Sequence, residues 1–593
     1  MTNLNQRWDL DSIFPGGSSS PELQEQLNSV RSQIAALKAK VEALGSELDA
    51  EQLRELVHEM QNVQTGFGEC RAFVACLTAQ NVRDNQAKLL QGDLGQISAA
   101  LAGVFTSIDH LLASIPEDRW QALFTDEELK ELSFNLNERR NVAKTKMAPD
   151  LEALATDLGV DGYHAWSHLY YTIVGDMSIE VERDGKAETL SMGQAANLLS
   201  NPDPDLRREV FHKFEAAWAE KAELFASTLN HLAGFRINLY QHRGWDDVLA
   251  EPLQINRMER ATLDAMWGAV QGGKLHLAKF LQRKAELLGL DQVAWYDLNA
   301  PLGDAGKEIP FEEAKAFVVD QFRKFSPEIA DFTQQALDRR WVEAENRGGK
   351  RPGAFCTSFP LSKESRVFMT YSGTISSLGT LAHELGHAYH GYVLKDRPMF
   401  LRRYAMNVAE TASTFGELLV VDGAISAASS PEEKLGILED KIGRSVAFFM
   451  DIHSRFLFET RFYEARKKGL VSAAQLNELM TEAQKEAFLD ALKEYHPHFW
   501  ASKLHFYSTG VPFYNFPYTF GYLFSAGVYA KAKEEGQGFA RRYAELLGDT
   551  ARMSVEDLAR RHLGADLTKP DFWEAAVKLA TDDVEEFLRL TDK

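Results

Sequence analysis

The stretch 381–387, Leu-Ala-His-Glu-Leu-Gly-His, constrains this 593-residue chain more than any other. Its two histidines are four residues apart, so they share a face only if the segment is a helix. Two neutral imidazoles on one face can bind a metal ion and leave its other side open to water. The sequence therefore predicts a helix that carries His383 and His387 as metal ligands.

A catalytic zinc site of this kind needs a third protein ligand. Glycine and proline residues after His387 predict that the helix ends, and a new helical pattern begins near Asn407. Glu410 lies there among small, largely uncharged neighbours, where a carboxylate has few partners other than a cation. We predict Glu410 as the third ligand of one zinc ion. Glu417, on the same face, either accepts an N–H from a ligating imidazole or is a solvated carboxylate.

Glu384 is predicted to act on water rather than to bind the metal. A carboxylate beside a zinc ligand can accept a proton from water that the ion activates, which is the chemistry of peptide hydrolysis. His390 would continue the same helix face. A catalytic zinc keeps its fourth position open, so we interpret His390 as a hydrogen-bonded packing residue.

Two segments together resemble the M3 family of zinc metallopeptidases, and within it the oligoendopeptidase F group. They are His-Glu-Leu-Gly-His at 383–387 and Glu-Thr-Ala-Ser-Thr-Phe-Gly-Glu at 410–417. The first motif alone would also fit unrelated peptidases, whereas the combination is more specific. Further similar segments spread the resemblance over nearly the whole chain: 8–15, 349–356, 505–507 and 517–522. The resemblance implies an endopeptidase that acts on short unstructured peptides.

The resemblance also implies groups that stabilise the oxyanion. The family places a donor tyrosine and a histidine in the segment 505–529, where His505 and Tyr518 match best by motif and Tyr522 next. Losing one such donor typically costs about 3–4 kcal/mol of transition-state stabilisation. The other tyrosines of the segment are expected to be packing residues.

A strand is predicted over 365–374, immediately before the metal-binding helix, from its β-branched and aromatic residues. Its edge could hydrogen-bond an extended peptide, or the strand could pair only within a small sheet. The resemblance favours substrate contact, with Tyr371 and Gly373 as substrate-binding residues. A hairpin is also predicted around Asp184-Gly185, because residues alternate on both sides.

Helical patterns dominate the rest of the chain. Near the start, Ser20 and Pro21 mark a helix start before apolar residues at helical spacing. We expect an N-terminal helical domain of residues 1–195 and a catalytic domain of residues 196–593. The predicted fold is mainly α, a large helical metallopeptidase with small β-sheet and hairpin elements beside the active-site helix.

Composition limits the classes of partner. A net charge of −21 and a pI near 5.3 argue against nucleic acid and anionic membrane surfaces. No uninterrupted apolar run of about 18 residues is present, so no membrane span is expected. Three cysteines without a disulfide or metal-binding pattern fit a reducing compartment, and we expect the protein in the cytoplasm.

The sequence thus predicts a zinc endopeptidase that cleaves internal bonds of short unstructured oligopeptides, with Glu384 as general base. One alternative is a zinc carboxypeptidase, which would need a cation for the terminal carboxylate; the candidates are Lys350, Arg351, Arg402 and Arg403. The other is a non-catalytic peptide-binding protein that retains zinc for stability, which leaves Glu384 without a role.

Overall fold

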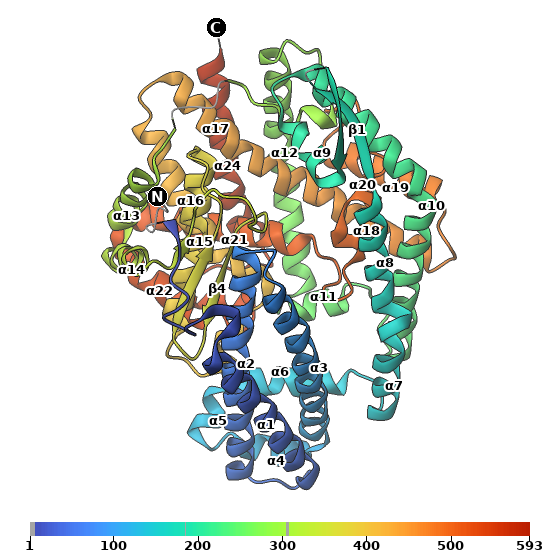
Figure 1. Ribbon diagram of the computed structural model, residues 1–593, viewed down its shortest axis with the longest axis vertical. Helices are drawn as coiled ribbons and strands as arrows, with labels where there is room; N and C mark the ends of the chain where they lie inside the picture. Colours follow the sequence, from blue (N-terminus) through green and yellow to red (C-terminus); the bar gives the residue numbers. More distant parts are fainter. Residues whose placement is uncertain (1–5, 184, 304–307, 593) are drawn as a thin grey trace. The chain divides into compact units, whose positions relative to one another are not determined.

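The computed structural model describes residues 6–183, 185–303 and 308–592 (Figure 1). In these ranges the chain is mainly helical with two small sheets, which confirms the predicted fold class. Backbone contacts divide it into two compact units of three segments each. The first unit contains Met1–Lys146, Lys307–Gly423 and Lys531–Ala565, and the second contains Met147–Gly306, Ala424–Ala530 and Asp566–Lys593.

The first unit begins with a bundle of three long helices that lie side by side in Figure 1: α1 (Pro21–Ala43), α2 (Ala50–Gln80) and α3 (Asn85–Ser114). Three short helices follow: α4 (Glu117–Leu123), α5 (Glu127–Glu131) and α6 (Ser133–Lys144). α1 begins as the sequence predicts, because the Ser20 hydroxyl accepts the Leu23 N–H at 3.3 Å. Leucine, isoleucine and valine at helical spacing fill the core between the helices.

Within the described residues, α3 is the one helix long and apolar enough to cross a membrane by length and composition. One such helix is weak evidence, because core helices of water-soluble proteins pass the same test. The buried side chains of α3 repeat every three or four residues and face the bundle core: Leu90, Leu94, Ile97, Leu101, Val104, Ile108 and Leu112. A one-sided bundle helix accounts for this pattern.

The remaining elements of the first unit surround a three-stranded sheet. The strands are β3 (Val342–Glu343), β4 (Phe355–Phe359) and β5 (Glu364–Phe368), and the helices are α13 (Phe311–Phe325), α14 (Pro327–Asp338), α15 (Ile375–Leu394), α16 (Met406–Ala427), α22 (Ala540–Asp549) and α23 (Val555–Leu563). β5 is central, parallel to β3 and antiparallel to β4. The predicted strand is present as β5, and of the two alternatives for its edge the structure shows pairing within a small sheet, with β4 along 364–368 and with β3 at Val367 and Phe368. The open edge near α15 belongs to β4.

A carboxylate from the helical bundle holds the turn that follows β4. Glu69 of α2 is buried and accepts the N–H groups of Leu361 and Ser362, at 2.8 and 3.2 Å, and the Ser362 hydroxyl. Burial raises the pKa of Glu69, and these hydrogen bonds oppose that effect. Because the turn begins where β4 ends, α2 fixes the position of the open-edged strand.

The second unit consists of the hairpin and long helices. β1 (Ser178–Arg183) and β2 (Lys186–Ser191) pair antiparallel with Ser178 opposite Ser191, which confirms the predicted hairpin, although Asp184 lies outside the described residues. The helices are α7 (Pro149–Gly159), α8 (Ala165–Asp176), α9 (Met192–Asn197), α10 (Pro204–His242), α11 (Ala250–Ile255), α12 (Arg260–Leu287), α17 (Pro431–Val446), α18 (Ile452–Arg466), α19 (Ala473–Ala487), α20 (Phe499–Ser502), α21 (Phe516–Glu535) and α24 (Pro570–Thr591). The division between the units falls within α16 and α21.

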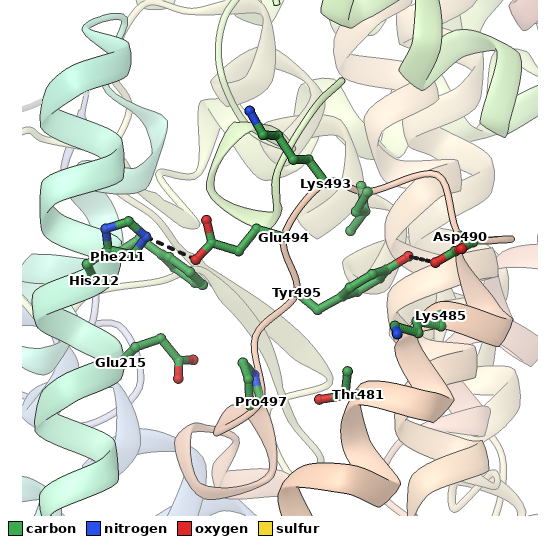
Figure 2. A pocket seen from close by; sticks show the side chains of 11 residues that line it. Phe211, His212, Glu215, Thr481, Lys485, Asp490, Lys493, Glu494, Tyr495 and Pro497 are labelled. Atoms are coloured by element: carbon green, nitrogen blue, oxygen red, sulfur yellow. Dashed lines mark hydrogen bonds and ion pairs between the residues drawn. The ribbon is translucent and has the colours of Figure 1, made fainter. Parts of the chain in front are cut away.

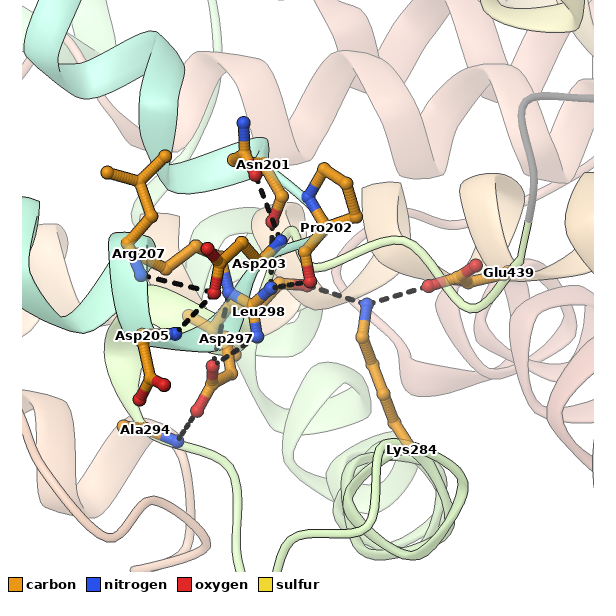
Figure 3. A network of polar contacts seen from close by, with 11 residues as sticks. Asn201, Pro202, Asp203, Asp205, Arg207, Lys284, Ala294, Asp297, Leu298 and Glu439 are labelled. Carbon is orange, nitrogen blue, oxygen red and sulfur yellow. Dashed lines mark hydrogen bonds and ion pairs between the residues drawn. The ribbon is translucent and has the colours of Figure 1, made fainter. Parts of the chain in front are cut away.

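A buried ionic network joins α10, α12 and α17 to the segment 294–302 of the second unit (Figure 3). Arg207 of α10 donates to Asp297 Oδ1 at 2.8 Å, and both side chains are at most 5% exposed. Lys284 of α12 donates to Glu439 of α17 at 2.8 Å. Burial lowers the pKa of Lys284, and Glu439 opposes that effect. Each charge is therefore compensated inside the unit.

We expect Asp297→Asn to lower the free energy of unfolding by about 3 kcal/mol, because it leaves the buried Arg207 guanidinium without its counter-charge. Urea unfolding followed by circular dichroism measures the change. Glu209→Gln is the control, since it removes an exposed ion pair with Lys213 on α10 and should cost less than about 0.5 kcal/mol. Equal losses in the two variants would contradict the role of the buried pair.

Candidate metal centre

The first helix of the centre, α15, starts at a capping box. The Thr374 hydroxyl accepts the Ser377 N–H at 3.1 Å, and the Ser377 hydroxyl accepts the Thr374 N–H at 3.0 Å. His383 and His387 are four residues apart within this helix and therefore lie on one face. Their ring centroids are 5.0 Å apart and their planes are nearly perpendicular, at 85°.

The second helix, α16, crosses α15 at unusually short range. A Cβ atom at Gly386 would lie 2.3 Å from the Ala412 carbonyl oxygen, and one at Gly416 would lie 3.1 Å from the Ala382 carbonyl oxygen. Two glycines, one on each helix, therefore remove the side chains that would hold the backbones apart. The close crossing brings the acidic residues of α16 to the histidines of α15.

The three predicted metal ligands come together at this crossing. The Nε2 atoms of His383 and His387 lie 3.2 and 3.5 Å from the same oxygen, Oε2 of Glu410. Within the part of the chain that is described, this is the one group of three His, Cys, Asp or Glu residues whose ligand atoms all lie within 4.8 Å of one another. All three side chains are partly exposed, so an ion and a substrate can both reach them.

Neighbouring groups fix the orientation of each ligand. Glu417 Oε2 lies 3.0 Å from Nδ1 of His383, so that Nδ1 donates and Nε2 keeps its lone pair for a metal. His387 is hydrogen-bonded to the backbone of Ala409. The Ser413 hydroxyl donates to Glu410 Oε2 at 2.8 Å. Every ligand is thus held by a group of α16 that is not itself a ligand.

Glu384 points its carboxylate into a buried position beside the ligands. Its side chain is 5% exposed, and its Oε2 atom is buried with no hydrogen-bond partner among the described residues. Burial raises the pKa of Glu384 to about 7; His383 opposes this effect, and the nearby Glu410 carboxylate adds to it. An unpaired buried carboxylate oxygen is costly unless water or substrate satisfies it. The buried Oε2 atom of Glu384 is therefore available to water or to a ligand at the metal centre.

The charge states of the ligands suit a divalent cation. Burial lowers the pKa of His387 to about 4, so its imidazole is neutral at pH 7. Although burial opposes ionisation of Glu410, its hydrogen bond to His383 and its attraction to both imidazoles lower its pKa to about 2. Two neutral imidazoles and one carboxylate are a donor set that zinc accepts in catalytic sites. The residues present therefore fit one zinc ion.

His390 is a hydrogen-bonded packing residue, as the sequence predicts. It is buried, its Nε2 lies 2.9 Å from the Thr550 hydroxyl, and its ring stacks on Tyr404 at 4.1 Å. Burial lowers its pKa to about 3. A neutral imidazole with these contacts is a packing residue one turn from the ligands.

The residues expected to stabilise the oxyanion belong to the second unit, and two of the three lie together. The His505 ring is 6.1 Å from that of Tyr518, and Tyr514 lies against both, at 5.0 and 5.4 Å. Tyr522 is elsewhere: it is buried, hydrogen-bonds to Ser445 at 2.9 Å and stacks on a phenylalanine. These contacts give Tyr522 a packing role, and the donor roles of His505 and Tyr518 stay predictions.

Tyr514 also belongs to this aromatic group, although its match to the family motif does not single it out as an oxyanion donor. The side chain of Asn515 accepts the Phe516 N–H, which starts α21 directly after Tyr514. Tyr514 and Tyr518 are four residues apart and stack across this helix start. An asparagine before a helical pattern is a signal that the sequence does contain. Burial lowers the pKa of the neighbouring His505 to about 4, so its imidazole is neutral.

The two residues expected to bind substrate are held by a loop. The Tyr371 hydroxyl donates to the Ile309 carbonyl at 2.9 Å, and the Gly373 carbonyl accepts the Ile309 N–H at 2.8 Å. Gly373 has φ +75°, and a Cβ there would lie 2.7 Å from the Glu308 side chain. The Tyr371 hydroxyl and the Gly373 carbonyl thus already have partners within the protein. Direct contact of these two residues with substrate stays a prediction.

The four cations that could bind the terminal carboxylate of a carboxypeptidase substrate differ in how far they are already bound within the protein. Lys350 is almost fully buried, lies 3.3 Å from Glu343 and donates to two backbone carbonyls. Arg351 stacks on Phe355. Arg402 and Arg403 line a cavity beside β4. The ammonium group of Lys350 is therefore already bound by groups of the sheet region and is not available to a substrate carboxylate.

A second cavity, of about 610 Å³, lies in the second unit and contains ionisable groups that pair with one another (Figure 2). His212 lies 3.0 Å from Glu494, and the Tyr495 hydroxyl donates to Asp490 at 3.1 Å. Glu215 accepts hydrogen bonds from two histidines just outside the wall, His496 and His498. For these paired groups, the contacts indicate a structural role.

The sequence of the chain matches the model of Peptidase family M3 over residues 197–579. The chain belongs to peptidase family M3. A second match, to the family described as Oligopeptidase F, covers residues 112–178, so the expected domain boundary at 195/196 falls between the two matched segments. Members of this family are zinc-dependent metalloendopeptidases, and the predictions of an enzyme and of its family are confirmed.

Known proteins of the family align with almost the full length of this M3 peptidase. Oligopeptidase PepF of Bacillus subtilis is 24% identical over 600 residues, which cover 99% of this chain and 87% of PepF. An oligoendopeptidase F homolog of Lactococcus lactis is 20% identical and covers 99% and 97% of the two chains. The crystal structure of oligoendopeptidase-F from Enterococcus faecium has a TM-score of 0.70 at 17% identity, covering 96% of this chain and 97% of that chain. The last similarity shows a shared fold.

We expect Gly386→Ala to separate α15 from α16, because the new methyl group meets a backbone carbonyl that cannot rotate away. Overpacking of this kind typically costs about 1–3 kcal/mol, and the displaced ligands should lower zinc occupancy as well. Thermal unfolding and metal analysis by mass spectrometry measure the two effects. Gly436→Ala on α17, where nothing lies within 4 Å, is the control and should not destabilise the protein. A Gly386→Ala protein with full zinc and unchanged stability would refute the close crossing.

We expect Glu417→Gln to weaken zinc binding about tenfold, because the amide holds the His383 N–H without the carboxylate charge. Competition with a chromophoric chelator measures the affinity. The exposed Glu432→Gln on α17 is a matched loss of one negative charge and should leave the affinity unchanged. Equal affinities in both variants would make Glu417 an ordinary helix carboxylate.

Proposed function

We propose that this M3 peptidase hydrolyses internal peptide bonds of short unstructured oligopeptides at one zinc ion held by His383, His387 and Glu410. The observation that carries the proposal is the geometry of the crossing: both imidazole Nε2 atoms converge on one Glu410 oxygen, and the unpaired Glu384 carboxylate lies beside them. A purely structural zinc site would use four protein ligands and would not need Glu384.

When bound, the zinc ion lowers the pKa of water and polarises the scissile carbonyl. Glu384 accepts the proton of the attacking water and returns it to the leaving amine. Glu417 and the Ala409 backbone keep both imidazoles in the orientation that the chemistry requires. His505 and Tyr518 are proposed donors to the oxyanion. Hydrolysis then yields two shorter peptides without a covalent enzyme intermediate.

The open edge of β4 supports the proposal of an extended peptide substrate. β4 makes backbone hydrogen bonds to β5 on one side, and residues 355–359 make none to other elements in the described ranges. β4 also packs on α15, the helix of the two histidine ligands. An extended peptide added to this edge would use backbone groups alone, which suits substrates of varied sequence.

We also place the protein in the cytoplasm. All three cysteines are free: Cys70 and Cys76 are buried, and Cys356 is partly exposed. Burial raises the pKa of Cys70 to about 12, so this thiol is protonated and unreactive at neutral pH. Free thiols in this pattern are typical of a reducing compartment.

We expect Glu384→Gln to lower kcat for internal cleavage by about 10²–10⁴-fold, because the amide cannot accept the proton of water. Internally quenched peptides of different lengths, with products identified by mass spectrometry, measure the effect. Zinc content should stay the same, and a chelator should abolish wild-type activity.

Glu127→Gln on α5, an exposed carboxylate, is the control and should cleave like the wild type. Single-residue products would favour the carboxypeptidase. Zinc-loaded wild type that cleaves no peptide would contradict hydrolysis and favour a binding role.

A further inference from the structure

A cavity of about 530 Å³ in the first unit lies beside the metal-binding helix. Residues of α2, α3, β4 and the segment 391–404 line it. Gly391 lies on its wall one helical turn after His387, on the same face of α15, and Lys395 lies one turn further. Part of the cavity wall therefore lies beyond His387 along the direction of α15.

The lining of the cavity is cationic in a protein of net charge −21. Five basic side chains reach it: Arg71, Lys363, Lys395, Arg402 and Arg403. Among the described lining residues the one carboxylate is Glu364, which already pairs with Arg366 at 2.9 Å and Arg339 at 3.5 Å. The positive charge of the wall is thus larger than the negative charge that faces it.

Three of these cations have no carboxylate partner at hydrogen-bond distance within the described chain. Arg71 makes no hydrogen bond or ion pair with the described residues, and Lys395 lies over the Tyr392 ring at 3.7 Å. Arg402 donates to the backbone carbonyls of Arg397 and Pro360. By contrast, Lys363 pairs with Asp396 at 2.7 Å. Cations held at a cavity wall without counter-charges are suited to a carboxylate ligand.

The open edge of β4 lies in the same wall. Residues 356–359 of β4 line the cavity, so a peptide paired to that edge would pass the cations. Gly391 and Lys395 lie about 6 and 12 Å along α15 from His387, at 1.5 Å per residue. An extended peptide covers this span with about two to four residues, at 3.3 Å per residue. The cations therefore face a substrate position a short way from the scissile bond.

We propose that this cavity binds a carboxylate of the peptide substrate, two to four residues from the bond that is cleaved. The proposal rests on the proposed function and adds a specificity to it. The carboxylate can come from an aspartate or glutamate side chain or from the carboxyl end of the peptide. The same cations recognise both, because both offer two oxygens and one negative charge.

The test uses internally quenched peptides in which glutamate or glutamine is placed at each position around the cleaved bond. Each peptide is made with a free and with an amidated carboxyl end. In the wild type, glutamate at one position two to four residues from the bond should raise kcat/KM about fivefold to tenfold over glutamine. A preference that follows the free carboxyl end instead identifies the terminal carboxylate as the source.

Arg71→Glu should abolish this preference, because like charges now meet at the wall. Arg71→Lys should keep most of it. Lys88→Glu on α3 is the matched charge reversal on an exposed side chain that does not line the cavity, and should keep the full preference. High salt should reduce the preference in the wild type.

Binding separates failure of this inference from failure of the proposed function. Fluorescence anisotropy of the same labelled peptides on zinc-loaded Glu384→Gln protein should show tighter binding of the glutamate peptide, and Arg71→Glu in that background should remove the difference. Equal kcat/KM and equal binding of glutamate and glutamine peptides, with both kinds of carboxyl end, would overturn the cationic site even if cleavage is observed. Absence of cleavage with a retained binding preference would overturn hydrolysis alone.

Discussion

The metal centre depends on how closely two helix backbones approach. Gly386 and Gly416 let α15 and α16 cross where any larger residue would meet a carbonyl oxygen. At a normal interaxial distance of 8–10 Å, the carboxylate of Glu410 would have to extend much further to reach both imidazoles. The same crossing supplies Glu417, Ser413 and the Ala409 backbone, which orient the ligands. Small residues between the motifs are therefore as necessary as the ligands.

The site was predictable from the sequence wherever chemistry and helical periodicity coincide. The spacing of His383 and His387 and the isolated position of Glu410 predict one metal site, and the structure brings these residues together. Periodicity says nothing of distance between helices, so the glycine contacts at the crossing could not be predicted. The segment 505–522 shows the same limit. Motif similarity selected Tyr522, which is buried against Ser445, and passed over Tyr514, which stacks beside His505.

The fold was predictable in its class and in its local elements, but not in its pairing. Apolar spacing predicts the long helices, and residues 365–374 predict a strand, of which β5 is the regular part. Strand order follows from contacts between residues far apart in sequence, which single-sequence patterns do not contain. β3 pairs with β5, so the strand nearest α15 in sequence is central and β4 has the open edge. The two units likewise take segments from distant parts of the chain.

The open edge and the cationic cavity divide substrate recognition between them. Backbone hydrogen bonds to β4 are available to almost any extended peptide, so they give binding without selectivity. Discrimination must then come from side-chain contacts, and the proposed cationic site at Arg71, Lys395 and Arg402 supplies one kind. In an acidic protein, long-range repulsion disfavours acidic peptides, and a local positive wall offsets this at one position. The arrangement favours peptides with a single well-placed carboxylate over peptides that are acidic throughout.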